Sequence, residues 1–337
     1  MKAELKRIVK FVAPYGIISK HNLALESRQE VAYLSNIENT PEPEIYNKYG
    51  ERMRVFYIQD TLGRFMTSFC IGRQSRYIYW DRANKKLENH FYSHEQILKT
   101  SGTPRKKYAI LIESDQIVPQ DYLIFDRNPG LNKEFDKIFT FSERLLDKYE
   151  NALLYIYGTV WYGTPKGGGE MRENLFEEKT ANVSMLCSNK EYTELHKLRK
   201  EIAIYLRNNH LADTFGNFDG GPRLSQVAEA LTKYRFNVAI ENSLTRNYFT
   251  EKIMNCFASM TIPIYIGADN VGSFFNEDGI IKLTPNTTML ELERVIKSCT
   301  KEYYSERISA VKDNYSRVQD YLCPEDYIYS RYSHIFG

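Results

Sequence analysis

The residues with the clearest capacity for chemistry are Thr250, Glu251 and Lys252, three polar groups that precede an apolar helical pattern. Thr250 is a good N-cap, so the amide hydrogens of the first turn and the helix dipole would point at a bound anion, and Lys252 adds a full positive charge. These groups suit a phosphate. The Glu251 carboxylate accepts hydroxyl groups, so its expected partners are ribose or sugar hydroxyls. The alternative is a capped first turn with a surface ion pair.

These three residues belong to a strand, loop, helix, strand unit. Alternating apolar residues predict a strand over 236–240, apolar residues at helical spacing predict a helix over 250–260, and residues 262–267 predict the next strand. In such a unit ligands bind beyond the carboxyl end of the strand, where the loop meets the helix start.

The same alternation runs from about residue 105 to the C-terminus, which predicts α/β units around parallel sheets. Strands are predicted at 108–112, 137–141, 153–157, 183–186 and 213–215, and helices at 143–148, 190–207 and 288–321. The first hundred residues are less regular, with strands indicated at 56–58 and 77–80. The glycine-rich segment 163–170 is interpreted as the link between two domains, which we place at 1–165 and 166–337.

Composition excludes several classes of protein. A chain of 337 residues is long enough for two average domains, and a net charge of +2 argues against a nucleic-acid binder that relies on a basic face. Residues 1–16 contain no apolar run of the kind found in signal peptides or membrane spans, so we expect a cytoplasmic protein, with peripheral contact at the inner face of a bacterial membrane left open. The cysteines are odd in number and scattered, which predicts neither disulfides nor a thiolate zinc site; they are Cys70, Cys187, Cys256, Cys299 and Cys323.

Four motifs in order carry a family resemblance. Tyr-Arg-Phe at 234–236, Ile-Glu-Asn-Ser at 240–243, Tyr-Phe-Thr-Glu-Lys at 248–252 and Ile-Pro-Ile-Tyr-Ile-Gly at 262–267 resemble the signature of the α-1,3/4-fucosyltransferase family, glycosyltransferase family 10. That signature is commonly written Y-K-F-x-x-x-F-E-N-S, D-Y-x-T-E-K and V-P-V-x-x-G. The sequence departs from it at Arg235, Ile240 and Asn247. None of the three departures removes a charged contact on which the proposed site depends.

The resemblance implies an α/β fold of the GT-B type, in which two Rossmann-like domains face a cleft. Residues 1–165 would then be the acceptor-side domain with the catalytic base, and residues 166–337 the GDP-sugar-binding domain, with the last helix free to pack back on the first. By the same resemblance Arg199 binds the donor pyrophosphate; the remaining donor-site residues are Ser188, Asn189, Gly216, Tyr234, Asn242, Tyr248, Glu251 and Lys252. From periodicity alone, Arg199 is equally a surface arginine beside an apolar stripe.

The segment 111–115, Leu-Ile-Glu-Ser-Asp, resembles the place where the family carries its catalytic carboxylate, at the end of a buried strand. Glu113 is therefore the candidate base, with a pKa raised by a partly buried cleft. Two alternatives remain: Glu113 caps the turn after the strand, or Asp115 is the base.

Transfer from a GDP-sugar needs a base for the acceptor hydroxyl and positive charge for the leaving diphosphate. No two aspartates stand two residues apart, so a metal-binding D-x-D motif is missing, and Arg199, Lys252 and the helix start take the second task. We expect no metal and no cofactor. The resemblance implies inversion, GDP-β-L-fucose as donor, a glycan or lipid-linked oligosaccharide as acceptor, and an α-1,3-type linkage. The alternatives are another nucleotide-sugar donor in surface-polysaccharide assembly, or a non-catalytic relative that binds nucleotide sugars.

Overall fold

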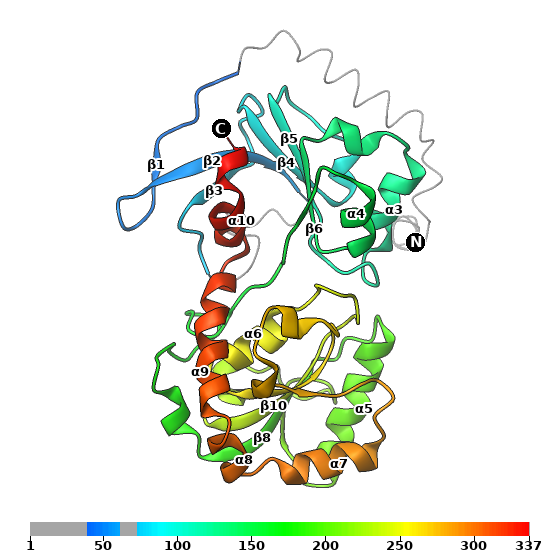
Figure 1. Cartoon of the computed structure of the whole chain (residues 1–337), viewed down its shortest axis with the longest axis vertical. Coiled ribbons are helices and arrows are strands. Elements are labelled where there is room, and N and C mark those ends of the chain that lie inside the picture. Colours follow the sequence, from blue (N-terminus) through cyan, green and yellow to red (C-terminus); the bar gives the residue numbers. More distant parts are fainter. Residues whose placement is uncertain (1–38, 61–72, 337) are drawn as a thin grey trace.

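The computed structural model describes residues 39–60 and 73–336, and it forms two lobes stacked along the long axis of the molecule (Figure 1). Each lobe contains one sheet, and all strand pairs within the sheets are parallel except β1 with β2. The α/β class predicted from the sequence is confirmed. The expectations for residues 1–16 and for Cys70 lie outside the described residues.

The first sheet has the strand order β1-β2-β4-β5-β6-β7, with β3 paired to β2. Its strands are β1 (Ile45–Tyr46), β2 (Arg52–Gln59), β3 (Ile78–Asp81), β4 (Asn89–Ser93), β5 (Lys106–Ile110), β6 (Lys137–Thr140) and β7 (Ala152–Leu154). Helices α3 (Pro119–Arg127) and α4 (Glu143–Lys148) belong to this lobe. Parallel strands are covered on both faces, and for that reason Phe91 and Phe139 stack at the centre of the sheet with almost no exposure.

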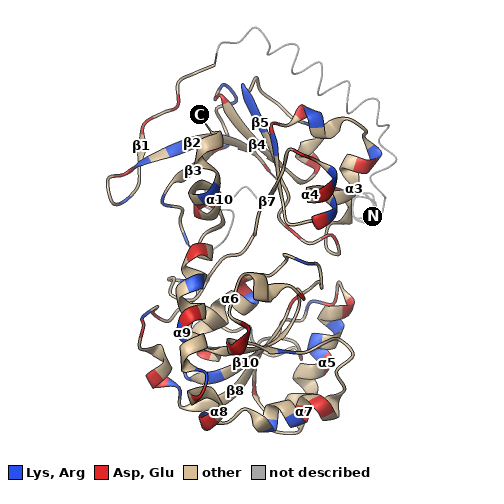
Figure 2. Ribbon diagram, viewed as in Figure 1, with Lys and Arg blue, Asp and Glu red and all other residues tan. Residues whose placement is uncertain are grey.

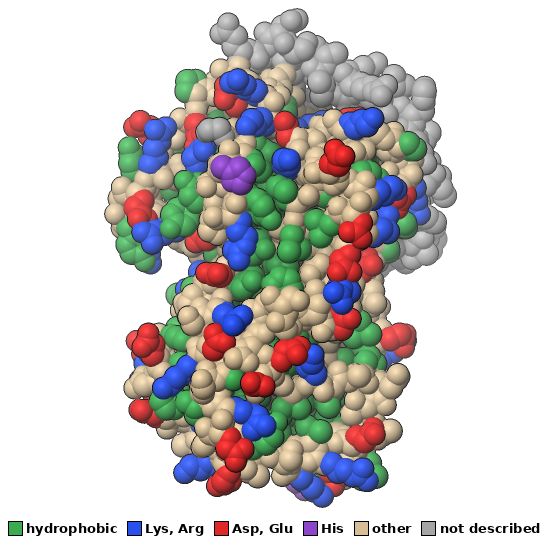
Figure 3. Space-filling view, viewed as in Figure 1, with side chains coloured by type: hydrophobic (Ala, Val, Ile, Leu, Met, Phe, Trp, Pro, Cys, Tyr) green, Lys and Arg blue, Asp and Glu red, His purple; other side chains and the backbone are tan. Residues whose placement is uncertain are grey.

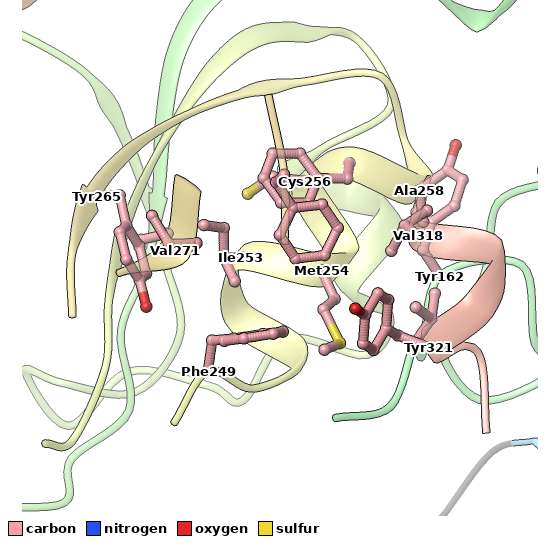
Figure 4. Close-up of a cluster of buried hydrophobic side chains, with 14 of the residues drawn as sticks. Tyr162, Phe249, Ile253, Met254, Cys256, Ala258, Tyr265, Val271, Val318 and Tyr321 are labelled. Atoms are coloured by element: carbon pink, nitrogen blue, oxygen red, sulfur yellow. The ribbon is translucent and has the colours of Figure 1, made fainter. Parts of the chain in front are cut away.

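The second sheet has the order β12-β11-β10-β8-β9, all parallel. Its strands are β8 (Ala181–Leu186), β9 (Asp213–Phe215), β10 (Tyr234–Ile240), β11 (Ile262–Ile266) and β12 (Ile281–Lys282), and its helices include α5 (Glu194–Asn208) and α6 (Glu251–Ala258). All seven residues of β10 are buried. Helix α6 packs on β10 and β11, and its apolar side chains Ile253 and Met254 lie in the central cluster of Figure 4. The core therefore fixes the start of α6 at the sheet edge.

The end of the chain joins the two lobes. Helices α7 (Met289–Ser298), α8 (Lys301–Ser305) and α9 (Ile308–Arg317) cover the second sheet, and α10 (Pro324–Tyr332) lies on the first lobe (Figure 1). There the buried Glu325 carboxylate accepts a hydrogen bond from Trp80 Nε1 at 3.0 Å, and Asp326 accepts one from Ser75 Oγ at 2.6 Å. These buried polar contacts fix α10 against β3.

The strands and helices predicted after residue 105 are present, with ends that differ by a few residues, except that the helical segment 288–321 is divided into α7, α8 and α9. In the first lobe β1, β4 and α3 were not predicted. Strand β4 reads Asn-His-Phe-Tyr-Ser, and its polar residues hide its burial; inside the fold His90 Nδ1 pairs with the Tyr92 hydroxyl at 2.9 Å. Helix α3 begins at Pro119 and ends after only nine residues. The glycine-rich segment 163–170 forms a compact turn in which Gly163 N donates to Gly168 O at 2.8 Å.

Candidate active site

The carboxyl ends of the two sheets face each other, and the loops that follow their strands are joined by hydrogen bonds. Thr245 Oγ1 donates to Asp115 at 2.9 Å, and Asn247 Nδ2 donates to the Phe141 carbonyl at 3.2 Å. In the space-filling view the molecule is narrower between the two lobes, and charged side chains lie on both sides of this narrow region (Figure 3). A substrate bound at one sheet edge would thus lie against the other.

Glu113 follows β5 and lies at this junction. The Tyr248 hydroxyl, from the second lobe, is 3.4 Å from Glu113 Oε2. Burial raises the pKa of the Glu113 carboxyl above its usual range; Lys252 opposes that rise and Glu251 adds to it. The pKa of Glu113 is thus shifted upward, as we expected from the sequence. A half-buried carboxyl with a raised pKa has the property that a general base near neutral pH requires.

Asp115, the rival base, is exposed and accepts the Thr245 hydroxyl. It lies two residues further along the same loop. Both carboxylates contact the second lobe, but Glu113 is the one whose pKa is raised by burial and on which the charges of Lys252 and Glu251 act, and this favours Glu113 as the base.

Arg199 lies on α5 with its side chain only 5% exposed. Its guanidinium makes two long contacts, from Nη1 to the Ile240 carbonyl at 3.4 Å and from Nη2 to Ser188 Oγ at 3.3 Å. The third nitrogen, Nε, is buried and has no hydrogen-bond partner among the described residues. A buried guanidinium this poorly satisfied is costly, and an anionic ligand would satisfy it.

Lys252 lies in the first turn of α6, where Thr250 is the N-cap as predicted. Its Nζ is 2.9 Å from Thr250 Oγ1, 3.3 Å from Glu251 Oε1 and 3.4 Å from Glu241 Oε2. Burial alone would lower the pKa of Lys252, but Glu251 and Glu241 offset it, and the pKa is raised. Figure 2 marks an acidic and a basic residue on α6. The ammonium group is therefore firmly charged.

Glu241 was part of a quoted motif but received no role from the sequence. It is fully buried, and it accepts the Thr250 backbone N–H at 2.9 Å and the Thr250 hydroxyl at 2.7 Å. The carboxylate thus takes the amide hydrogen of the N-cap residue, whereas the first turn, whose amide hydrogens we expect to face a phosphate, begins at Glu251. Glu241 lies there because the positive end of the helix dipole attracts a nearby carboxylate. Glu241 holds Lys252 in place instead.

The cations of the second lobe act on one another and on the base. The Arg199 charge acts on Lys252, and burial together with Arg199, Lys252 and Lys190 lowers the pKa of His196 to about 4. Lys252 and Lys190 also act on Glu113. Arg199 thus acts on Lys252, and Lys252 in turn acts on the carboxyl of the other lobe. Lys190 and His196 had not been singled out in the sequence.

Asn242 and Tyr248 are close together at the same junction. Ser114 Oγ donates to Asn242 Oδ1 at 3.4 Å, and the Asn242 side chain also contacts the Tyr248 hydroxyl. The Tyr248 ring is 3% exposed and lies 4.9 Å from the ring of Phe141. Both residues thus bridge the lobes, where the sequence had placed them in the donor pocket alone.

Two further predicted residues border this site. Gly216 follows β9 with φ +98°, and a Cβ atom there would lie 2.1 Å from the Cys187 carbonyl oxygen, so only glycine fits. Asn189 is exposed, and its backbone N–H donates to Asn217 Oδ1 at 3.3 Å. Both lie beside Ser188 at the ends of β8 and β9.

Tyr234 lies away from the site, contrary to the predicted nucleotide contact. It is the first residue of β10, and its hydroxyl donates to Asp213 at 2.6 Å, at the start of β9. The seven-residue strand β10 separates it from Glu241 by roughly 20 Å, at about 3.3 Å per residue. Tyr234 instead lines a surface cavity of about 650 Å³ at the amino-terminal edge of the sheet. The motif identified the strand but not which end of it carries the ligand.

The three departures from the family signature are structural. Arg235 donates to the Ala181 carbonyl and to Asn182 Oδ1 at 3.2 and 2.9 Å, Ile240 is buried in the core, and Asn247 adopts φ +61° in a turn closed by Asn270. Asparagine tolerates this left-handed conformation better than most residues. None of these three side chains lies among the charges of the site.

Within the described residues, 39–60 and 73–336, no group of three or more His, Cys, Asp or Glu side chains is arranged to hold a metal ion. In the same part of the chain no helix has both the length and the apolar character needed to cross a bilayer.

Comparisons with known proteins agree with this geometry. Residues 176–307 match the model of the family described as Glycosyltransferase family 10 (fucosyltransferase) C-term. Over 63 residues the chain is 40% identical to alpha-(1,3)-fucosyltransferase FucT of Helicobacter pylori, and this aligned segment covers 19% of this chain and 13% of that protein. Over 96 residues it is 31% identical to an alpha-(1,4)-fucosyltransferase of Arabidopsis thaliana, and this aligned segment covers 27% of this chain and 24% of that protein. The matched segments thus span a quarter or less of these two relatives.

Solved structures share the fold. A crystal structure of alpha1,3-fucosyltransferase with GDP-fucose aligns with a TM-score of 0.50 and 17% identity, over 88% of this chain and 97% of that one. An alpha-glucosyltransferase in complex with UDP-glucose and DNA aligns with a TM-score of 0.50 and 10% identity, over 94% and 95% of the two chains. At these identities the likeness concerns the fold alone, and the fold is that of GT-B glycosyltransferases.

Proposed function

We propose, from the premise that residues 176–307 form a family 10 C-terminal domain, that this protein is an inverting fucosyltransferase. It would move L-fucose from GDP-β-L-fucose to a hydroxyl of a glycan or lipid-linked oligosaccharide, in an α-1,3-type linkage. The observation that carries the proposal is the placement of Arg199. Its buried and incompletely bonded guanidinium acts electrostatically on Lys252, and Lys252 acts on the Glu113 carboxyl of the other lobe.

The chemistry is a single displacement. The acceptor hydroxyl oxygen attacks the anomeric carbon, and Glu113 takes the hydroxyl proton as the new carbon–oxygen bond forms. The bond from the anomeric carbon to the phosphate oxygen breaks, and GDP leaves with the electron pair. Arg199 and Lys252 stabilise the charge that develops on the diphosphate, which is the role that preorganised cations perform best. One base and no covalent intermediate are needed, and the sugar is inverted.

We also propose that transfer needs no metal ion, because two protein cations already face the expected position of the diphosphate. Assays with and without EDTA test this part separately. Equal rates support it, and a rate that EDTA abolishes and Mg²⁺ or Mn²⁺ restores contradicts it.

The donor is tested by thermal shift with GDP, UDP and dTDP, because a ligand at 100 times its dissociation constant adds about 2.7 kcal/mol to the free energy of unfolding. GDP alone is expected to raise Tm. GDP-fucose is then assayed against acceptors that contain galactose or N-acetylglucosamine, with the product linkage read by NMR. Stabilisation by UDP or dTDP in place of GDP would point to another donor, and GDP binding without transfer of any sugar would point to a non-catalytic relative.

For location we propose the cytoplasm, with peripheral contact at a membrane surface. Four cysteines of the described residues are free and buried thiols, which suits a reducing compartment. Fractionation of the native host with detection of the intact chain tests this. Recovery from a secreted fraction would contradict it.

A further inference from the structure

His94 stands at the carboxyl end of β4, beside the strand that leads to the proposed base. Strands β4 and β5 pair in parallel with Ser93 opposite Ile110, so the residues after them, His94 and Glu113, emerge at the same sheet edge. The backbone of His94 has φ +54°, a left-handed conformation that few residues other than glycine adopt. Such conformations persist where the surrounding structure enforces them, and they cluster at functional sites.

The first turn of α3 holds both residues. Asp121 is 6% exposed, and its carboxylate forms an ion pair with His94 Nδ1. The neighbouring Tyr122 donates its hydroxyl to the backbone carbonyl of Glu113. One helical turn thus fixes an imidazole and the loop that carries the base, and an acidic partner on one ring nitrogen sets the orientation of a histidine.

The charges around His94 favour its protonated form. Burial lowers the pKa of His94, but the bond to Asp121 and the charges of Asp121, Glu113 and Asp60 offset it, and the pKa is raised above its usual value. Burial raises the pKa of Glu113, and the positive charge of His94 lowers it. The charged groups that face Glu113 are Lys252, Glu251, His94 and Lys190. His94 is the member of this set that comes from the first lobe.

We propose that His94, oriented by Asp121, is a positioning residue of the transfer reaction, which keeps Glu113 in the carboxylate form that accepts the acceptor's proton. The inference rests on the proposed function, and it gives the acceptor side a titratable partner for the base. Lys252 pairs with Glu241 and is expected to bind the diphosphate, and Lys190 belongs to the second lobe, so the imidazolium is the cation that shares the lobe of Glu113. No atoms are transferred to His94 in this role.

The first test is the pH dependence of kcat/KM, whose acid limb reports the ionisation of the base in the free enzyme. In His94→Gln the missing cation raises the pKa of Glu113, so the acid limb moves to higher pH by about one unit, with recovery toward the wild-type rate at alkaline pH. His94→Lys restores a charge and is expected to return the limb toward its wild-type position. His334→Gln removes an exposed histidine from the end of the chain and serves as the matched control. A limb that does not move in His94→Gln overturns the inference.

A second test needs no activity. The ring protons of His94 are assigned by NMR from their loss in His94→Gln, and their titration is followed in the full-length protein. Asp121→Asn and Glu113→Gln are each expected to lower the pKa of His94, because each removes an anion. An unchanged titration in Glu113→Gln would show that the two side chains do not interact, and the inference would fall. If the wild-type chain transfers no sugar while these titrations shift as expected, the proposed function fails and the coupling of His94 to Glu113 stands.

Discussion

The Tyr248 hydroxyl donates to Glu113 Oε2 over 3.4 Å and thereby joins the loop before α6, in the segment that matches the family 10 model, to the carboxyl group after β5. The same hydroxyl contacts the Asn242 side chain. The donor-side loop and the proposed base are therefore in contact before any substrate arrives. Binding of a donor beside Tyr248 would therefore act on the carboxylate that we propose as the base.

Replacement of Tyr248 by phenylalanine removes this hydroxyl and keeps the ring against Phe141. Loss of one hydrogen bond to a charged group is worth about 1 kcal/mol at this length, so kcat/KM is expected to fall about fivefold. The acid limb of its pH profile moves upward because the carboxylate loses a donor. Tyr304→Phe, which removes a buried hydroxyl that donates to the Met260 carbonyl, is the control. Equal kinetics for the two variants would remove Tyr248 from the reaction.

Arg199→Ala is expected to lower kcat/KM by a factor that corresponds to about 2 to 4 kcal/mol, the scale of one preorganised charge contact. Arg199→Lys keeps the charge and loses the fork, so an intermediate rate is expected. Without donor the Ala variant should unfold at an unchanged or higher temperature, because a buried and poorly bonded guanidinium is removed. Arg207→Ala lies on the same helix, where Arg207 pairs with Asp219 on the surface, and it should transfer normally. Near-normal turnover of Arg199→Ala would exclude the phosphate role.

Glu113→Gln is expected to bind GDP with wild-type affinity in calorimetry and to lose transfer. Its stability gives an independent check, because a folded carboxyl with a raised pKa binds its proton more tightly than the unfolded chain does. That contribution is fully present below the unfolded pKa and is lost as pH rises through the folded pKa, so the variant should be more stable than wild type above that range. Asp115→Asn is the matched control, with transfer retained. Transfer by Glu113→Gln would move the role of base to another residue.

Lys252→Ala is expected to slow transfer by an amount equivalent to about 2 to 4 kcal/mol and also to destabilise the fold. The second effect follows because the fully buried Glu241 loses its cation, and an unpaired buried charge costs about 3 kcal/mol. Adding Glu241→Gln to Lys252→Ala removes that charge, so chemical unfolding should show recovered stability while transfer stays slow. Recovery of both, or of neither, would contradict the separation of the two roles.

The second lobe was readable from its sequence because local patterns determine it. The alternation in 236–240 and the cap at Thr250 predicted β10 and α6, and the structure has both. In the first lobe the polar strand β4 was missed, since only its partners in the fold explain how His90 becomes buried. Local patterns report local structure, and burial of polar residues is a property of the whole fold.

The pairs of residues that connect the two halves of the site could not be predicted from the sequence for the same reason. Asp121 meets His94 and Tyr248 meets Glu113 across separations that no spacing rule reveals. Tyr234 is a different case, because the length of β10 alone could have placed it at the wrong end for a ligand. The charge chemistry of single residues was thus predictable, and their pairing was not.

Lys179 provides a prediction about folding that is separate from catalysis. Its ammonium group is buried and has no carboxylate partner within the described part of the chain, and burial lowers its pKa to about 7. It donates to the carbonyls of Leu231, Thr232 and Ser259 and to the Thr261 hydroxyl. The unfolded chain keeps the proton up to its higher ordinary pKa, so between these two values the folded state holds fewer protons and stability rises with pH. Lys179→Met removes these four hydrogen bonds and is expected to be less stable than wild type, by a margin that grows by about 3 kcal/mol from pH 6 to pH 9 in urea unfolding. The exposed Lys233→Met is the control, and a margin that stays constant with pH would mean that Lys179 remains charged inside the fold.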